Sequence, residues 1–245
     1  DLGRFLTNQT EESCTQYNVL KVARRRFLRK ADASDADFYE RALWNGILGN
    51  QRRVDPTGVT SYIYMLPLGS AGSGVVRKAW GRSDYGFPCC WGTLSESFAK
   101  LGDSIFFRAR DERAMYVNQW VSADASWPEL GLTLEQRADF PAHPTTTSTI
   151  TVRARAGATV EFTLRVRVPG WLKAGSGSVR VNGVALADAL VPTSFVSICR
   201  AWRSGDVVDV SYPPTLWTTP LDDARAEYNA TLAFMYGPLV LAGVD

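Results

Sequence analysis

The first part of the chain carries apolar side chains at helical spacing. Between Ser13 and Ala31 they recur at steps of three and four residues, which places them on one face of an α-helix. The positions that form this stripe are Tyr17, Val19, Leu20, Ala23, Phe27 and Leu28. The pattern therefore predicts a helix over residues 13–31, with one side turned toward a core.

Two further helices are predicted before residue 103. Ser34 or Asp35 is expected to cap the first of them, and Gly49 to end it. Its inward-facing side chains are expected to be Phe38, Ala42, Ile47 and Leu48. The other is a short helix over residues 93–101. Between the two lies a stretch rich in glycine, proline and tyrosine at residues 50–88, for which we expect a long ordered loop.

Beyond residue 103 the apolar period changes from that of a helix to that of a strand. Apolar and polar residues alternate in short segments separated by Gly, Pro and Asn, as in strands with one buried face. These segments are residues 115–121, 132–136, 148–153, 160–168, 179–183 and 207–212. Such a series is typical of an antiparallel β-sandwich. The change in the spacing of apolar residues near residue 103 predicts an α plus β multidomain protein, with a helical domain over residues 1–103 and a β-sandwich over residues 104–245.

The composition limits the classes of function. Of the 245 residues, 45% are hydrophobic and 21% are charged, which is enough to build a globular core. A net charge of +2 gives no support for a nucleic-acid partner, and no apolar run reaches the roughly 18 residues of a membrane-spanning helix. Sequons at Asn8 and Asn229 slightly favour a secreted or cell-wall-associated protein. No feature indicates an oligomeric state.

Three of the four cysteines lie in two tight groups. Cys14 follows Glu12 by two residues and Cys89 is adjacent to Cys90, whereas Cys199 stands alone in a strand-like segment and is expected to pack there. Adjacent cysteines are poorly placed to form a disulfide with each other, but both can bind one metal ion. Zinc accepts four ligands drawn from thiolates, imidazoles and carboxylates. Glu12, Cys14, Cys89 and Cys90 form such a set.

Other interpretations of these cysteines stay open. A disulfide between Cys14 and one of the adjacent pair is possible in an oxidising compartment, and buried cysteines without a chemical role are common. His143, the sole histidine, lies in a turn-like Pro-Ala-His-Pro stretch, which argues against a Ser-His-Asp or Cys-His arrangement. A metal-bound thiolate is then the one strong nucleophile. The residues alone favour a structural zinc site slightly over a catalytic one.

Recognisable segments occur in order through the whole chain. They are Glu11–Lys21, Tyr39–Leu48, Cys89–Thr93, Glu96–Ser97, Lys100–Phe106, Arg167–Trp171, Val181–Gly183, Trp202–Asp206 and Tyr236–Gly243. Together they resemble glycoside hydrolase family 127 and its relative, family 146, which comprise β-L-arabinofuranosidases. The segments around Cys14 and after Lys100 are most similar to plant-type members.

The resemblance implies a fold, a cofactor and a reaction. The fold is expected to consist of the C-terminal helices of an (α/α)6-barrel catalytic domain followed by a β-sandwich, with the earlier barrel helices lying before Asp1. The cofactor is expected to be zinc, with Glu12, Cys14, Cys89 and Cys90 as its ligands. Cys89 is expected to be the nucleophile of a retaining glycosidase that acts on β-L-arabinofuranosides or related glycans.

The resemblance also implies roles for residues near the metal ligands. The family's acid/base glutamate lies upstream of its Glu-x-Cys motif, so it is expected before Asp1, and Glu11 is not that residue. Leu94 stands where the relatives have glycine, which leaves the sugar and the linkage open. A non-catalytic carbohydrate-binding protein or a structural zinc domain of the same fold is the alternative. The residues predicted to contact the carbohydrate substrate are Tyr85, Trp91 and Glu96.

Overall fold

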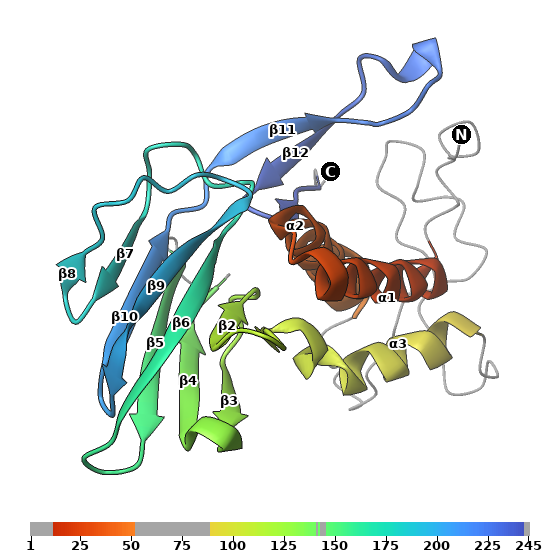
Figure 1. The fold of residues 1–245 in the computed structure, drawn as a ribbon. Helices are drawn as coiled ribbons and strands as arrows, with labels where there is room; N and C mark the ends of the chain where they lie inside the picture. The colour runs from red at the N-terminus through yellow and green to blue at the C-terminus, as the bar shows by residue number, and fades with distance from the viewer. Residues whose placement is uncertain (1–11, 52–88, 141, 143–145, 243–245) are drawn as a thin grey trace. The chain divides into compact units, whose positions relative to one another are not determined.

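A computed structural model describes residues 12–51, 89–140, 142 and 146–242 (Figure 1). The chain divides into two compact units. The first comprises residues 1–29, 38–100 and 216–245, and the second comprises residues 30–37 and 101–215. The chain thus changes unit close to residue 103, where the apolar period changes. The C-terminal residues group with the helices, however, which the alternation of apolar residues does not indicate.

Helix α1 (Ser13–Lys30) forms as predicted. Its buried positions are spaced by three and four residues and are Ser13, Tyr17, Leu20, Ala23 and Phe27. Val19 and Leu28 were predicted to share this face but are 38% and 53% exposed. Each is the sequence neighbour of a buried residue, and successive helical residues point about 100° apart. The inward face is therefore narrower than predicted.

Helix α2 (Ala33–Ala42) begins two residues before the earliest start that its predicted caps, Ser34 or Asp35, allow. The side chain of Asp32 accepts a hydrogen bond from the backbone N–H of Ser34 at 2.9 Å. Aspartate is a good N-cap because its carboxylate satisfies a free N–H of the first turn. The prediction of Ser34 or Asp35 as the cap is therefore wrong, and Asp32 has that role.

The helix continues beyond α2 with altered winding. A π-helical segment, η2 (Leu43–Ile47), and a 3-10 turn, η3 (Leu48–Asn50), follow directly. Ile47 is fully buried as predicted, but Phe38 is 45% exposed, contrary to prediction. A Cβ at Gly46 would lie 2.6 Å from Cγ of Gln16, so only glycine lets α1 approach this closely.

Helix α3 (Cys89–Ala99) starts four residues before its predicted beginning and is followed by the 3-10 turn η5 (Leu101–Ser104). Cys89 and Cys90 therefore form its first turn and do not belong to the preceding loop. Hydroxyl groups support this turn, because Thr93 Oγ1 donates to the Cys90 carbonyl at 3.0 Å. The predicted loop at residues 50–88 lies almost wholly outside the described residues.

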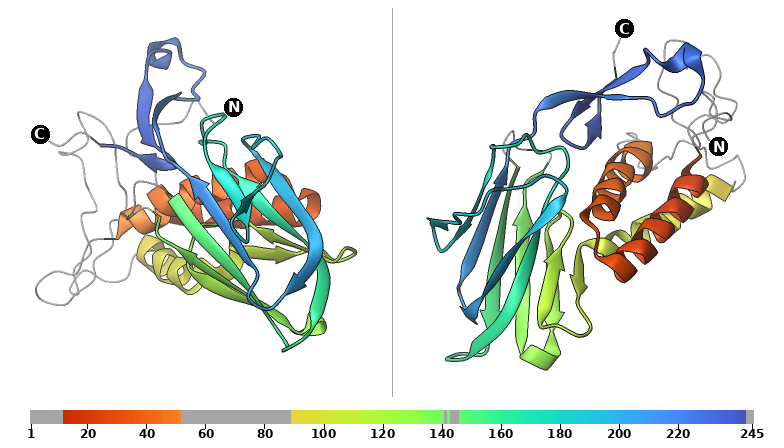
Figure 2. Two further views of the ribbon diagram at one scale, coloured as in Figure 1. Left: turned by 90° about the vertical axis from the view of Figure 1, so that its left-hand side faces the viewer. Right: turned by 45° about the horizontal axis from the view of Figure 1, so that its top comes forward.

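The second unit contains a four-stranded sheet of order β1-β2-β6-β9 and a six-stranded sheet of order β3-β4-β5-β10-β7-β8 (Figure 2). The strands are β1 (Phe106–Arg108), β2 (Ala114–Val117), β3 (Ala123–Trp127), β4 (Leu132–Ala138), β5 (Thr146–Ala154), β6 (Thr159–Val168), β7 (Ser178–Val181), β8 (Val184–Ala185), β9 (Ser194–Arg203) and β10 (Val207–Tyr212). The sheets contact each other through aromatic rings. Phe162 of the first sheet lies 6.0 Å from Trp127 of the second and 5.4 Å from Trp202, between ring centroids.

One strand pair departs from the antiparallel prediction. Among the described strands, β2 and β6 alone are paired in parallel. Strands β3, β4 and β5 lie between them in the sequence and belong to the other sheet, so the chain can return to the first sheet in its original direction. Each of the six predicted strand segments nevertheless overlaps a strand.

A buried ion pair joins β6 to the start of α2. The side chain of Arg167 is 0% exposed and its Nη1 donates to Asp37 Oδ1. Its Nε donates to the Asn118 carbonyl at 2.6 Å, and Asp37 Oδ2 accepts from the Gly170 N–H at 3.0 Å. A Cβ at Gly170 would lie 2.7 Å from Asp37 Oδ2, so glycine is required beside this pair. The motif Arg167–Trp171 thus has a structural role in the second unit, where it connects β6 to α2.

A small third sheet belongs to the helical unit. It consists of β11 (Leu216–Pro220), β12 (Leu232–Tyr236) and β13 (Leu239–Val240). The short turn η7 (Ala226–Tyr228) lies between the first two strands. Asn45 of η2 donates to the Pro238 carbonyl and accepts from the Val240 N–H, both at 2.8 Å. These bonds explain why the C-terminal residues group with the helices. Within the described ranges, no helix is long and apolar enough to span a bilayer.

Candidate metal and active site

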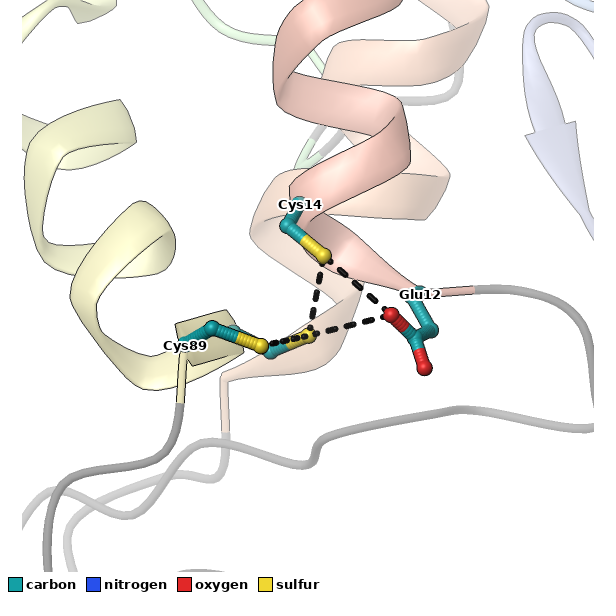
Figure 3. A group of neighbouring side chains, drawn as sticks. Glu12, Cys14 and Cys89 are labelled. Atoms are coloured by element: carbon teal, nitrogen blue, oxygen red, sulfur yellow. Dashed lines mark hydrogen bonds between the residues drawn. The ribbon is translucent and has the colours of Figure 1, made fainter.

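Four possible metal ligands meet at the starts of two helices in the first unit (Figure 3). Glu12 directly precedes α1 and Cys14 lies in its first turn, while Cys89 and Cys90 open α3. Their ligand atoms all lie within 4.8 Å of one another, although Cys14 and Cys90 are 76 positions apart in the sequence. The fold therefore brings together the four residues predicted as ligands.

The spacing of the ligand atoms suits a tetrahedral ion. Sγ of Cys90 lies 3.4 Å from Sγ of Cys14 and 4.0 Å from Sγ of Cys89. Oε2 of Glu12 lies 3.3 Å from Sγ of Cys14 and 4.0 Å from Sγ of Cys90. Tetrahedral sulfur ligands at about 2.3 Å from zinc lie about 3.8 Å apart. None of the four cysteines takes part in a disulfide within the described residues, and the sulfur separations in the cluster far exceed the roughly 2.05 Å of such a bond.

Burial and the neighbouring acidic groups both disfavour the thiolate form of Cys14. The pKa of the Cys14 thiol is raised from 9.0 to about 12, first by burial, then by hydrogen bonds with Cys90 and Glu12 and by the nearby thiols. Each of these effects disfavours a thiolate beside other negative groups. A divalent cation reverses this balance, because a metal-bound thiol is deprotonated. The donor set therefore fits zinc in both geometry and charge.

The three sulfurs differ in exposure. Cys90 is completely buried, Cys14 is half-buried and Cys89 is exposed. The position of each in its helix accounts for this, since Cys89 is the first residue of α3, whereas Cys90 contacts Ser13 and Cys14 of α1. Within the cluster, Cys89 is thus the sulfur that a reactant can approach most easily.

Ser13 supports the site and was not singled out from the sequence. Its hydroxyl donates to the Cys90 carbonyl at 3.1 Å, and its side chain is buried. The bond links the first turn of α1 to the first turn of α3. The signal that could have identified Ser13 is its place between the ligands Glu12 and Cys14.

The residues predicted to contact the sugar differ in their exposure to solvent and in their hydrogen bonds. Trp91 is half-buried on the first turn of α3, and its indole Nε1 is buried with no acceptor in the part of the chain that the structure describes. Glu96 is exposed, and its carboxylate accepts a hydrogen bond from the Tyr17 hydroxyl. Tyr85 and His143 lie outside the described residues.

Two other positions differ from what their sequence context suggests. Leu94 is fully buried at 0% exposure, so its side chain belongs to the packing around α3. Cys199 is exposed, and its prediction as a packing residue is wrong. On β9 the alternate residues Val196 and Ile198 are buried, which turns Cys199 to the other face.

Known proteins similar to this chain point to one family. A family model described as "Beta-L-arabinofuranosidase, GH127 catalytic domain" matches residues 3–103. A second, described as "Beta-L-arabinofuranosidase, GH127 middle domain", matches residues 114–214. The curated non-reducing end β-L-arabinofuranosidase of Bifidobacterium longum subsp. longum is 25% identical over 242 residues, which cover 94% of this chain and 34% of that protein.

Solved structures agree at the level of the fold. A structure described as a glycoside hydrolase superposes with a TM-score of 0.75 at 22% identity, covering 94% of this chain and 37% of its own. A GH127 β-L-arabinofuranosidase from Geobacillus stearothermophilus T6 gives a TM-score of 0.73 at 24% identity, covering 94% and 36%. The chain thus spans about a third of the length of these relatives. The two family models together cover most of it, and the chain belongs to glycoside hydrolase family 127.

Proposed function

We propose that this chain is the metal-binding part of a retaining glycoside hydrolase that cleaves β-L-arabinofuranosides or related arabinose-containing glycans. One observation carries the proposal: an exposed sulfur, Cys89, belongs to a compact set of four metal ligands. Membership of family 127 supports the reaction class. In this proposal α1 to α3 are the last helices of an (α/α)6 barrel, and the two contacting sheets form a β-sandwich.

In the proposed reaction all four residues of the cluster bind the metal, and Cys89 is in addition the nucleophile. Glu12, Cys14, Cys89 and Cys90 would hold one zinc ion, which would keep the thiols ionised. Sγ of Cys89 forms a bond to the anomeric carbon as the bond from that carbon to the leaving oxygen breaks and a general acid protonates that oxygen. Water, deprotonated by the same acid/base group, then attacks the anomeric carbon and releases the Cys89 thiolate. Two inversions give net retention.

The remaining roles follow from position. Cys90 is a ligand only, because its buried sulfur has no access to a sugar. Trp91 and Tyr85 are proposed to contact the sugar ring through their aromatic faces. We place the acid/base residue outside residues 1–245, as the resemblance implies, so that this chain supplies the nucleophile and its supporting ligands.

The alternative is a structural zinc domain or a carbohydrate-binding protein without activity. Structural zinc sites are closed, with four protein ligands shielded from reactants. The exposure of Cys89 to solvent favours the enzyme, since a ligand needed only for folding does not have to be accessible to a reactant.

Covalent labelling tests the proposal. An electrophilic arabinofuranose analogue is expected to attach to Cys89 in the zinc-loaded protein, and fragment ions of the peptide that contains both cysteines can separate Cys89 from Cys90. Cys199, an exposed thiol outside the cluster, serves as the internal control and should stay unlabelled. A matched xylopyranose analogue should label neither. Attachment at Cys90, or at a carboxylate such as Glu96, would overturn the assignment of the nucleophile.

A further inference from the structure

A second contact between α1 and α3 lies about one turn beyond Cys14 on α1 and about two turns beyond Cys89 on α3. Tyr17 follows Cys14 by three residues and Glu96 follows Cys89 by seven, which are spacings that keep side chains on one helix face. The Tyr17 hydroxyl donates a hydrogen bond to the Glu96 carboxylate across the two helices. Tyr17 is only 8% exposed, so its hydroxyl depends on a protein acceptor.

Two lysines flank this contact on the following turn. Lys21 Nζ lies 3.9 Å from the centroid of the Tyr17 ring, and Lys100 Nζ lies 5.9 Å from it. Lys21 comes from α1, four residues after Tyr17, and Lys100 follows Glu96 by four residues just beyond α3. Cations over the face of an aromatic ring are attracted to it. Tyr17 is therefore held by cations from both sides of the boundary between the helices, as well as by Glu96.

The metal ligands need a fixed spacing between the same two helices. Glu12 and Cys14 come with α1, while Cys89 and Cys90 come with α3. Four ligands about 3.8 Å apart suit zinc only if neither helix slides or rotates along the other. Residues that fix such a spacing before the ion binds lower the cost of ordering the site.

We propose that Tyr17 and Glu96 are positioning residues for the metal centre. Their hydrogen bond sets the distance between the first turns of α1 and α3, and so between Cys14 and the adjacent pair Cys89–Cys90. This role for Glu96 takes the place of the predicted sugar contact. The inference rests on the proposed metal site. Groups hydrogen-bonded directly to metal ligands are typically worth about 10–100-fold in metal affinity, and this pair, which holds the helices that carry the ligands, is expected to act at the lower end of that range.

Titration with Co²⁺ tests this role without any assay of activity. Tyr17→Phe removes the hydroxyl and keeps the ring, and it is expected to weaken Co²⁺ binding by about tenfold or more. The intensity of the visible bands of tetrahedral Co²⁺ should also fall, because the ligands are no longer held at the required spacing. Tyr39→Phe on α2 is the matched control, since Tyr39 is also 8% exposed, and it should bind Co²⁺ like the unmodified chain.

Substitutions at Glu96 separate positioning from simple packing. Glu96→Gln keeps an oxygen that accepts from Tyr17 and should retain nearly full Co²⁺ affinity, whereas Glu96→Leu should match Tyr17→Phe. The double variant with Tyr17→Phe and Glu96→Leu should lose no more than either single variant, because all three lack the same bond. Glu96 is exposed, so its variants are expected to fold even if Tyr17→Phe does not.

The outcomes distinguish this inference from the proposed function. Equal Co²⁺ affinity and spectra in the unmodified chain, Tyr17→Phe and Glu96→Leu would overturn the positioning role and leave the metal site intact. Additive losses in the double variant, or an equal loss in Tyr39→Phe, would also contradict it. Failure of the unmodified chain to bind Co²⁺ would overturn both the metal site and the positioning role.

Discussion

Replacement of Cys89 by serine is expected to lower the turnover of the zinc-loaded enzyme by about 10⁴-fold or more. The thiolate proposed to attack the anomeric carbon is lost, and a serine hydroxyl stays protonated near neutral pH and is a poor nucleophile without an adjacent base. Because Cys89 is the exposed ligand at the start of α3, its substitution should change the packing of the helix little. Steady-state hydrolysis of an aryl β-L-arabinofuranoside provides the measurement.

Cys90→Ser is the matched variant because the same change is made one residue further along. Cys90 is fully buried and is assigned to metal binding alone, so its loss should act through weaker zinc binding and lower stability. Added zinc is expected to restore part of the activity of Cys90→Ser and none of that of Cys89→Ser. The assignment is wrong if Cys89→Ser retains activity, or if zinc rescues both variants alike.

Replacement of Arg167 by methionine is expected to destabilise the second unit by about 3–5 kcal/mol. The side chain of Arg167 is 0% exposed and that of Asp37 only 20%, so the substitution leaves a largely buried carboxylate without its cation. The Asn118 carbonyl also loses the donor at 2.6 Å. Urea unfolding followed by tryptophan fluorescence measures the change in the free energy of unfolding.

Arg153→Met is the control for an exposed ion pair. Arg153 Nε lies 2.8 Å from Glu135 Oε2, and the two side chains are 54% and 31% exposed. Solvent-exposed pairs contribute about 0–1 kcal/mol, so this change should have little effect. Adding Asp37→Asn to Arg167→Met should recover part of the lost stability, because the buried charge is then removed. Equal unfolding midpoints for Arg167→Met and Arg153→Met would contradict the role of the buried pair.

Local patterns in the sequence predict most of the elements but not their boundaries. The stripe from Tyr17 to Phe27 predicts α1, and the alternating segments after residue 103 predict strands, since both patterns follow from which face of an element is buried. The cap at Asp32, the early start of α3 and the parallel pairing of β2 with β6 were missed. Each depends on hydrogen bonds or on a choice of sheet that neighbouring residues do not determine.

The cluster of possible metal ligands could be predicted from the sequence because such residues keep recognisable chemistry and spacing. Glu12, Cys14 and the adjacent cysteines were predicted as a group, and the structure brings all four together. The residues behind them could not be identified in this way. Ser13 bonds to Cys90 and Tyr17 to Glu96, each more than 70 positions away, and serine and tyrosine carry no distinctive signal on their own.

The zinc content of the purified protein, together with the coordination shell of the ion, tests most directly whether these four residues form a metal centre. One zinc ion per chain is expected, with an X-ray absorption spectrum that fits three sulfur ligands at about 2.3 Å and one oxygen ligand at about 2.0–2.2 Å. Substitution of Cys14 by serine should reduce the sulfur count by one. Absence of zinc after incubation with the ion, together with a disulfide between Cys14 and Cys89 or Cys90, would contradict the metal centre.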